Sequence, residues 1–106
     1  MRIEIVAFYP NQVKTKKSIL LGTLHIHLPE ISADIRGIRV FKKGKKVTFF
    51  MNRGVFFEEN TGKKGNYPIF SFKNVDKNKA FLDTLQHVGY HYLESQYPQC
   101  LLPPRP

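Results

Sequence analysis

A run of alternating apolar and basic residues, interrupted once by a glycine turn, occupies the middle of this 106-residue chain. It extends over residues 32–51, and its centre reads Lys42-Lys43-Gly44-Lys45. Glycine at this place supplies the positive φ that a tight connection between two strands requires. The stretch therefore predicts an antiparallel β-hairpin with a lysine-rich tip. The fold class then depends on how many further strands the flanking segments supply.

The first strand of this hairpin alternates out of phase, because Ile35 is one residue out of step with the apolar residues that follow it. A β-bulge at Gly37 would add one residue and restore the alternation. The bulge would place the apolar side chains of the strand on one face and Arg36 and Arg39 together on the other. This phase shift is the most specific structural prediction that the sequence supports.

The other segments predict more strands and one helix. Strands are expected at residues 2–9, 18–28, 33–42, 46–51, 55–58 and 67–72. The first strand is expected to close at Pro10-Asn11. A helix of about 18–20 residues is expected from an N-cap at Asp76 to Tyr97-Pro98. Gly89 lies inside this helix, where glycine costs about 1 kcal/mol relative to alanine, and this indicates a close contact.

These elements predict an α+β fold, a small antiparallel sheet of five to six strands followed by one C-terminal helix. Residues 1–97 are expected to form a single domain, and residues 98–106 a proline-rich tail. One helix covers only one face of a sheet, yet some strand residues add apolar surface to both faces, namely Ile19, Leu21, Phe50 and Phe56. The uncovered apolar surface predicts a homodimer.

Positive charge is concentrated in the middle of the chain. The sequence has 17 Lys and Arg against 8 Asp and Glu, a formal net charge of +9. Residues 36–79 contain 12 of the basic residues and 3 of the acidic ones, which accounts for the whole excess. Charge that served only solubility would be spread along the chain. The concentration therefore predicts a polyanionic partner.

Nucleic acid is the polyanion that this pattern favours, because phosphate binding needs several cations at once and single strands also stack on aromatic rings. The predicted binding residues are Arg36, Arg39, Lys42, Lys43, Lys45, Lys46, Arg53, Lys63 and Lys64. The two arginines beside Gly37 are the preferred contacts, and the lysines of the tip are expected to add nonspecific affinity. The competing interpretation is that lysines protect an edge strand from aggregation, which would explain one or two of them.

Metal binding and catalysis have little support in the sequence. The four histidines lack a cysteine pair and a carboxylate pattern around them, so no metal is expected at His25, His27, His87 and His91. Neither Cys100 nor Glu58-Glu59 has a base or orienting partner at a useful spacing. The sequence therefore predicts a protein that is not an enzyme and has no cofactor.

The expected location is the cytoplasm. Cys100 is the only cysteine, which excludes an internal disulfide. Glu4 interrupts the first apolar run, so the N-terminus does not resemble a signal peptide. No apolar run approaches the roughly 20 residues that cross a bilayer.

Several motifs resemble those of the SpoVG family of bacterial regulators. They are Gly22-Thr-Leu-His-Ile-His-Leu28, Ala33-Asp-Ile-Arg-Gly-Ile-Arg-Val40, Phe49-Phe-Met-Asn-Arg53 and Tyr67-Pro-Ile-Phe-Ser-Phe72. In this chain Gly37 is inserted into the family's Asp-Ile-Arg-Val motif. The resemblance implies a small dimeric α+β protein that binds DNA or RNA as a transcriptional or post-transcriptional regulator. By matching position it implies contacts at Arg36, Arg39 and Arg53.

Two alternatives remain open. Val40-Phe-Lys-Lys-Gly-Lys-Lys-Val47 and Gly62-Lys-Lys-Gly-Asn-Tyr-Pro-Ile69 are similar to the PC4 type of transcriptional coactivator. That resemblance implies a dimeric binder of single-stranded DNA. In the other alternative, the chain is a protein-interaction module that adds a strand of an acidic partner to the edge near residues 67–72.

Overall fold

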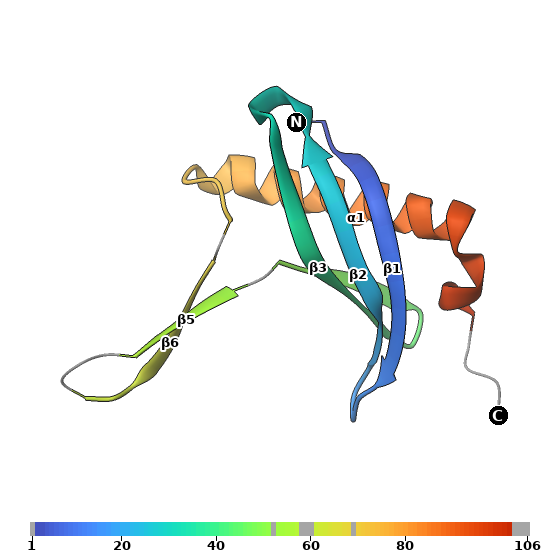
Figure 1. The fold of residues 1–106 in the computed structure, drawn as a ribbon, viewed down its shortest axis with the longest axis horizontal. Helices are drawn as coiled ribbons and strands as arrows, with labels where there is room; N and C mark the ends of the chain where they lie inside the picture. The colour runs from blue at the N-terminus through green and yellow to red at the C-terminus, as the bar shows by residue number, and fades with distance from the viewer. Residues whose placement is uncertain (1, 52, 58–60, 69, 103–106) are drawn as a thin grey trace.

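The computed structural model describes residues 2–51, 53–57, 61–68 and 70–102, and for residues 53–57 and 66–68 it describes the backbone alone. The elements in chain order are β1 (Glu4–Lys14), β2 (Ile19–Leu28), the 3-10 helix η1 (Pro29–Ile31), β3 (Ala33–Lys43), β4 (Lys46–Phe50), β5 (Arg53–Phe57), β6 (Lys64–Pro68), α1 (Val75–Gln96) and the 3-10 helix η2 (Pro98–Leu101). Strands β1 to β4 form one antiparallel sheet in that order, and β5 pairs with β6 in a second sheet. Figure 1 shows α1 crossing one face of the larger sheet and the β5–β6 hairpin extending away from it.

The predicted α+β class is confirmed, but the predicted single sheet is wrong, because the described strands divide into four and two. The last strand is also shifted, from the expected residues 67–72 to Lys64–Pro68. Pro68 has no N–H to continue a ladder. Beyond it, Phe70 and Phe72 pack against Phe81 of α1, with ring centroids 5.7 and 5.4 Å from that ring.

Strand β1 continues past Pro10-Asn11, where the sequence predicted its end, and reaches Lys14. An edge strand tolerates proline because only one of its sides is paired. The register with β2 shifts between Ile5 and Ala7 and again between Pro10 and Val13, so the strand bends over the sheet. The connection between the first two strands is consequently shorter than their predicted bounds imply, and it forms a tight turn.

The predicted bulge in β3 is confirmed. Ile35 and Ile38 are consecutive paired positions of β3, and two residues separate them where β2 has only one. Gly37 is one of these two residues and has a φ of 72°. Only glycine adopts this left-handed conformation without strain. The extra residue restores the alternation, so that Ile38 is fully buried while Arg36 and Arg39 are exposed.

The core lies between the sheet and one face of α1. Its buried apolar side chains include Phe8, Leu24, Ile26, Leu28, Ile38, Val40, Val47, Phe49, Phe81, Leu85 and Leu93. The predicted close contact at Gly89 is confirmed, because a Cβ there would lie 2.6 Å from Cζ of Phe49. The amide of Gln86 donates a hydrogen bond of 2.6 Å to the Val47 carbonyl and ties α1 to β4.

The helix begins earlier than predicted. Its N-cap is Asn74, whose side-chain oxygen accepts a hydrogen bond of 2.9 Å from the backbone N–H of Lys77. Asp76, the predicted cap, lies in the first turn, where the helix dipole favours a negative charge. The predicted end at Tyr97 is confirmed. No helix among the described residues has an apolar stretch long enough to cross a membrane.

Part of the predicted tail packs on the same core. Residues 98–101 form η2, and Leu101 contacts the buried cluster. The ammonium of Lys42 donates hydrogen bonds of 2.8 Å to the carbonyls of Leu101 and Leu102. The end of the described chain is therefore fixed to β3 by a side chain in the middle of the sequence.

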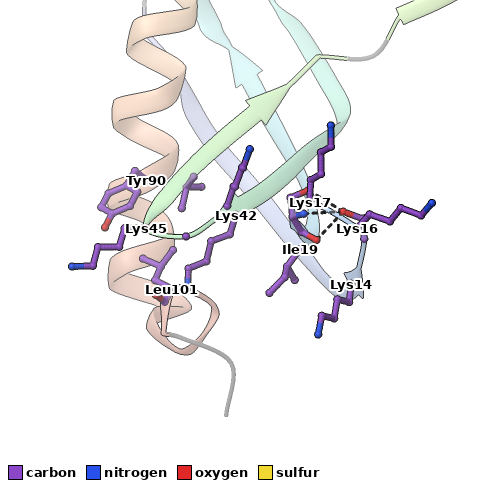
Figure 2. Close-up of a pocket in the computed structure, with 13 residues that line it drawn as sticks. Lys14, Lys16, Lys17, Ile19, Lys42, Lys45, Tyr90 and Leu101 are labelled. Carbon is purple, nitrogen blue, oxygen red and sulfur yellow. Dashed lines mark hydrogen bonds between the residues drawn. The ribbon is translucent and has the colours of Figure 1, made fainter. Parts of the chain in front are cut away.

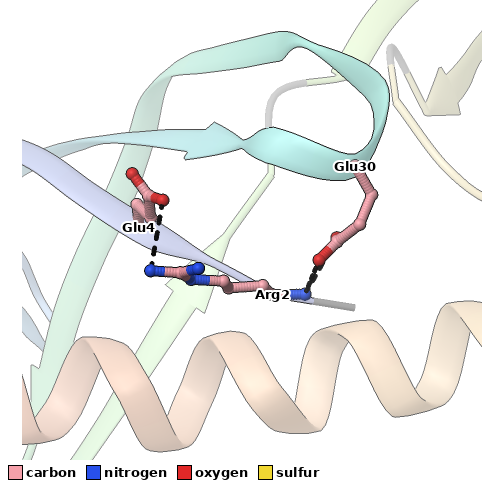
Figure 3. A network of polar contacts seen from close by, with 3 residues as sticks. All are labelled: Arg2, Glu4 and Glu30. Carbon is pink, nitrogen blue, oxygen red and sulfur yellow. Dashed lines mark hydrogen bonds and ion pairs between the residues drawn. The ribbon is translucent and has the colours of Figure 1, made fainter.

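The two ends of the larger sheet differ in charge. At one end, the backbone N–H of Arg2 donates to both carboxylate oxygens of Glu30, at 2.9 and 3.0 Å (Figure 3). The guanidinium of the same residue lies 3.6 Å from a carboxylate oxygen of Glu4. Asp34, near the start of β3, belongs to this end as well. The β1–β2 and β3–β4 turns, which carry lysines, lie at the other end.

Candidate nucleic-acid interface

Two lysine-rich turns meet at one end of the sheet. They supply Lys14, Lys16 and Lys17 from the β1–β2 turn and Lys43, Lys45 and Lys46 from the β3–β4 turn. The turns are neighbours because β2 pairs with β3, and Ile19 lies opposite Lys42 beside them. We call these six residues the lysine rim. Their side chains are exposed.

Local bonds satisfy the backbone of the first turn. The N–H of Thr15 donates to the Ser18 carbonyl at 2.8 Å, and the N–H of Ser18 donates to the Thr15 hydroxyl at 3.1 Å. The second turn contains only Gly44 and Lys45 between its strands, and Gly44 has the predicted positive φ, 61°. Both turns are therefore built from short-range interactions that leave the lysine side chains to the solvent.

Like charges face each other across the second turn. Lys43 and Lys46 form the last pair of the β3–β4 ladder. Directly opposed like charges destabilise a strand pair, and an anion bound between them would relieve the repulsion.

A groove of about 710 Å³ lies beneath the lysine rim on the helix side of the sheet (Figure 2). Five of the six rim lysines line it, together with Tyr90 of α1 and Leu101 of η2. None of the described lining residues is acidic. A concave surface that gathers one sign of charge over an apolar floor concentrates the field on a ligand of the opposite sign.

Lys42 differs from the other lysines of its turn, and its expected place at the solvated tip is corrected. Its side chain points into the groove side of the sheet and the residue is only 6% exposed. Adjacent residues of a strand point to opposite faces, so Lys42 turns inward where Lys43 turns outward. A buried ammonium needs acceptors, and the carbonyls of Leu101 and Leu102 supply them. Lys42 therefore links β3 to the C-terminal segment and has a structural role.

The sheet face opposite α1 is uncovered by any described element, and we call it the open face (Figure 1). Phe41 of β3 and Phe50 of β4 lie on it, with ring centroids 5.4 Å apart in an edge-to-face arrangement. Arg39 is the cross-strand partner of Phe50. Cross-strand partners lie on the same face, so an aromatic pair and a guanidinium occur together there.

The structure separates the predicted site residues into groups. Arg39, near the middle of β3, lines one hollow with Lys43, and Arg36 is exposed at the bulge farther along the strand. Lys45 and Lys46 lie at the adjoining β3–β4 turn. Lys63 and Lys64 belong to the β5–β6 hairpin, away from the lysine rim (Figure 1). Arg53 begins β5, and its side chain lies outside the described residues.

A histidine–aspartate cluster lies on the open face, toward the end of the sheet that carries Glu4 and Glu30. Nδ1–H of His27 donates to Oδ1 of Asp34 at 2.6 Å, and Nε2 of His25 lies 3.3 Å from the other carboxylate oxygen. The hydrogen bond from His27 lowers the pKa of Asp34.

The other two histidines, His87 and His91, lie on α1 with ring centroids 4.5 Å apart. The four histidines therefore do not converge. Among the described residues, no three side chains of His, Cys, Asp or Glu are arranged to hold a metal ion.

The comparison with models of known protein families finds no match, and the comparisons with curated proteins and with solved structures find none either. The resemblances to the SpoVG and PC4 families stay predictions. What this chain binds has to be argued from its own geometry and charge.

Proposed function

We propose that this protein binds nucleic acid through the lysine rim and the adjoining open face. The observation that carries the proposal is the meeting of two lysine turns around concave surfaces whose described lining residues include no carboxylate. A nucleic-acid strand presents phosphates in series, so it can contact several of these lysines at the same time. Each contact releases counterions, and affinity of this origin falls steeply with salt.

The resemblance to the SpoVG family adds a role to this proposal. We propose a transcriptional or post-transcriptional regulator acting in the cytoplasm, without catalytic activity or cofactor, on DNA or RNA. A PC4-like binder of single-stranded DNA is the closest alternative, and it would use the same basic surface. The predicted contact at Arg39 is kept in the proposal, and Lys42 is left out because its ammonium is bound within the protein. The predicted contacts at Lys63 and Lys64 are left out as well, because the β5–β6 hairpin lies away from the lysine rim.

Removing charge from each turn separately tests the proposal. One variant replaces Lys14, Lys16 and Lys17 by Gln, and a second replaces Lys43, Lys45 and Lys46 by Gln. Each is expected to weaken binding of a labelled oligonucleotide by about 10- to 100-fold and to reduce the salt slope by about 2. The matched control is the double variant Lys63→Gln with Lys64→Gln on the β5–β6 hairpin, for which a change below about threefold is expected. Parent-like affinity in both turn variants would overturn the proposal.

A homodimer belongs to the proposal too. The edge strand β1 exposes Val6 and Val13, with 52% and 45% of their surface accessible. A second copy could cover part of this apolar surface. Light scattering at micromolar concentration is expected to give twice the chain mass of 12.3 kDa. A single species with the mass of one chain would contradict the dimer, but it would not contradict the nucleic-acid proposal.

Strand addition at the β5–β6 hairpin is the second candidate function. Among the described strands, β5 and β6 pair only with each other, so each has an unpaired side. Unpaired strand edges accept an extended peptide. A pull-down repeated after nuclease digestion discriminates the two functions, because protein partners that survive digestion favour strand addition and partners that disappear favour nucleic acid.

A further inference from the structure

We infer that the open face contains a base-stacking subsite for single-stranded nucleic acid, formed by Phe41 and Phe50 and bordered by Lys17, Arg39 and Lys43. The inference rests on the proposed nucleic-acid function and specifies which form of nucleic acid the site takes. Its starting observation is that two aromatic rings and three cations from β3, β4 and the β1–β2 turn lie together on one uncovered surface.

The subsite is a shallow hollow of about 400 Å³. Ser18 and Thr48 complete its lining, and no described lining residue is acidic. Phe50 is 47% exposed, whereas its neighbour Phe49 on the other face is 8% exposed. The alternation of β4 therefore places one phenylalanine in the core and the next at the floor of the hollow.

The two rings form a platform because they occupy adjacent strands. Phe41 lies on β3, Phe50 on β4, and their ring planes are inclined by 82°. The edge of one ring supports the face of the other, an arrangement that aromatic pairs prefer. A single exposed phenylalanine is ordinary on a protein surface. A supported pair at the floor of a basic hollow is better explained by a flat, π-rich ligand group.

The charges around the hollow decide which ligand fits. Lys17 comes from the β1–β2 turn, Lys43 from the end of β3, and Arg39 from the middle of β3, so cations border the rings from different sides. A ligand that combines flat rings with regularly spaced anions is complementary to this surface. Nucleotides have both properties, and stacking on aromatic side chains tolerates every base.

The form of the ligand follows from accessibility. In a duplex the faces of the bases are stacked on each other, and only their edges reach the grooves. A ring on a sheet surface can stack only on a base whose face is free. The hollow therefore selects single strands, or unpaired loops, while the lysine rim alone would bind duplex and single strand by their phosphates.

Conservative replacements of the two rings test the inference. Phe41→Leu and Phe50→Leu keep a large apolar side chain and remove the aromatic face, and Phe50→Tyr keeps that face. Affinities are compared at one salt concentration for an oligothymidine, an abasic oligomer of equal length and a duplex. The leucine variants are expected to lose about 5- to 100-fold for oligothymidine. They should change less than about threefold for the abasic oligomer and the duplex, and Phe50→Tyr should bind like the parent.

Tyr9→Leu is the matched control, because Tyr9 is an exposed aromatic residue on the open face that does not line the hollow. A loss for this variant as large as for Phe50→Leu would contradict the subsite. So would a parent protein that binds the abasic oligomer as tightly as oligothymidine. Thermal unfolding of each variant shows whether its fold is intact before affinity is compared.

The outcomes separate this inference from the proposed function. If the parent binds all three oligomers equally and the lysine variants weaken all three, nucleic-acid binding stands and the stacking subsite is wrong. If no oligomer binds but polyglutamate does at the same salt, an acidic peptide is the ligand and both are wrong. Preference for oligothymidine that disappears only in the leucine variants supports both.

Discussion

Lys42 and Lys43 show how adjacent residues of one type acquire different roles. The pleat of β3 turns the first toward the helix side and the second toward the solvent. The first meets carbonyl acceptors from the C-terminal segment, at 2.8 Å. The second faces Lys46 across the turn. Charge alone does not distinguish them, but the face that each occupies does.

Replacing Lys42 by methionine is therefore expected to lower stability, whereas replacing Lys43 is expected to weaken nucleic-acid binding. Lys42→Met removes the donor from two carbonyls and should lower the free energy of unfolding by about 1.5–3 kcal/mol. Lys43→Met removes an exposed charge and should change stability by less than about 0.5 kcal/mol. Only the second variant loses a contact proposed for nucleic acid. Urea unfolding and oligonucleotide titration check the pair, and equal stability of the two variants would falsify the assigned roles.

The carboxylate of Asp34 gives a pH-dependent prediction. The hydrogen bond from His27 holds its folded-state pKa below the ordinary value of about 3.9. The stabilisation by this carboxylate is therefore complete above that ordinary value and is lost as the pH falls through the lower, folded-state pKa. Asp34→Asn should unfold at a lower temperature than the parent at neutral pH and match it once the carboxylate is protonated. A temperature difference that stays constant into strong acid contradicts this assignment.

At the scale of elements, contact between α1 and β4 sets the position of the helix. Gly89 leaves no room for a side chain, because Phe49 fills that space. Gln86 adds a hydrogen bond to the same strand. The helix backbone therefore lies closer to the sheet at this point than a larger residue would permit.

Gly89→Ala is expected to destabilise the protein despite the higher helix propensity of alanine. Overpacking against the Phe49 ring costs about 1–3 kcal/mol, and the gain in propensity returns about 1 kcal/mol. Combining it with Phe49→Leu makes room for the methyl group, so the double variant should lose less than the sum of the two single losses. Chemical denaturation of the four proteins measures this coupling. Strict additivity would show that the two residues do not compete for space.

Several elements were predictable because their signals are local. The break in the alternation of apolar residues around Gly37 predicted the bulge, and Gly44 predicted the tight turn. The N-cap was misplaced because Asn74 and Asp76 are both good caps, and which one is used depends on tertiary packing around the first turn. The division into two sheets was missed because pairing partners are not encoded in alternation.

The candidate site was predictable only in part for the same reason. The lysines around Gly44 stood out as a cluster in sequence. Lys14, Lys16 and Lys17 lie between two predicted strands in the sequence and were not assigned to the site. Their place follows from topology, because two consecutive hairpins whose inner strands pair bring both turns to one end. Phe50 was predicted only as part of the apolar surface that a second copy would cover, and its place beside Phe41 and Arg39 became clear only from the pairing of β3 with β4.

For the whole molecule, the number of lysines that act together sets the response to salt. Six rim lysines on a single strand correspond to a slope of about −4 in a plot of log affinity against log salt. The affinity for oligothymidine is therefore expected to fall about 10²- to 10³-fold between 50 and 200 mM salt. Titrations at four salt concentrations measure the slope. A slope of about −2 or shallower, the value expected for three lysines, would mean that the two turns do not contact phosphates together.

The opposite charges at the two ends of the sheet have a kinetic consequence. Glu4, Glu30 and Asp34 lie at one end and the lysine rim at the other, so the molecule carries an electric dipole along its strands. In the field of a polyanion such a dipole turns before the surfaces touch. Most encounters with the proposed nucleic-acid partner would then begin with the lysine end in front, and few diffusional collisions would be wasted on the wrong side. Orientation during approach would make capture fast, and the contacts of the bound state would determine how long the complex lasts.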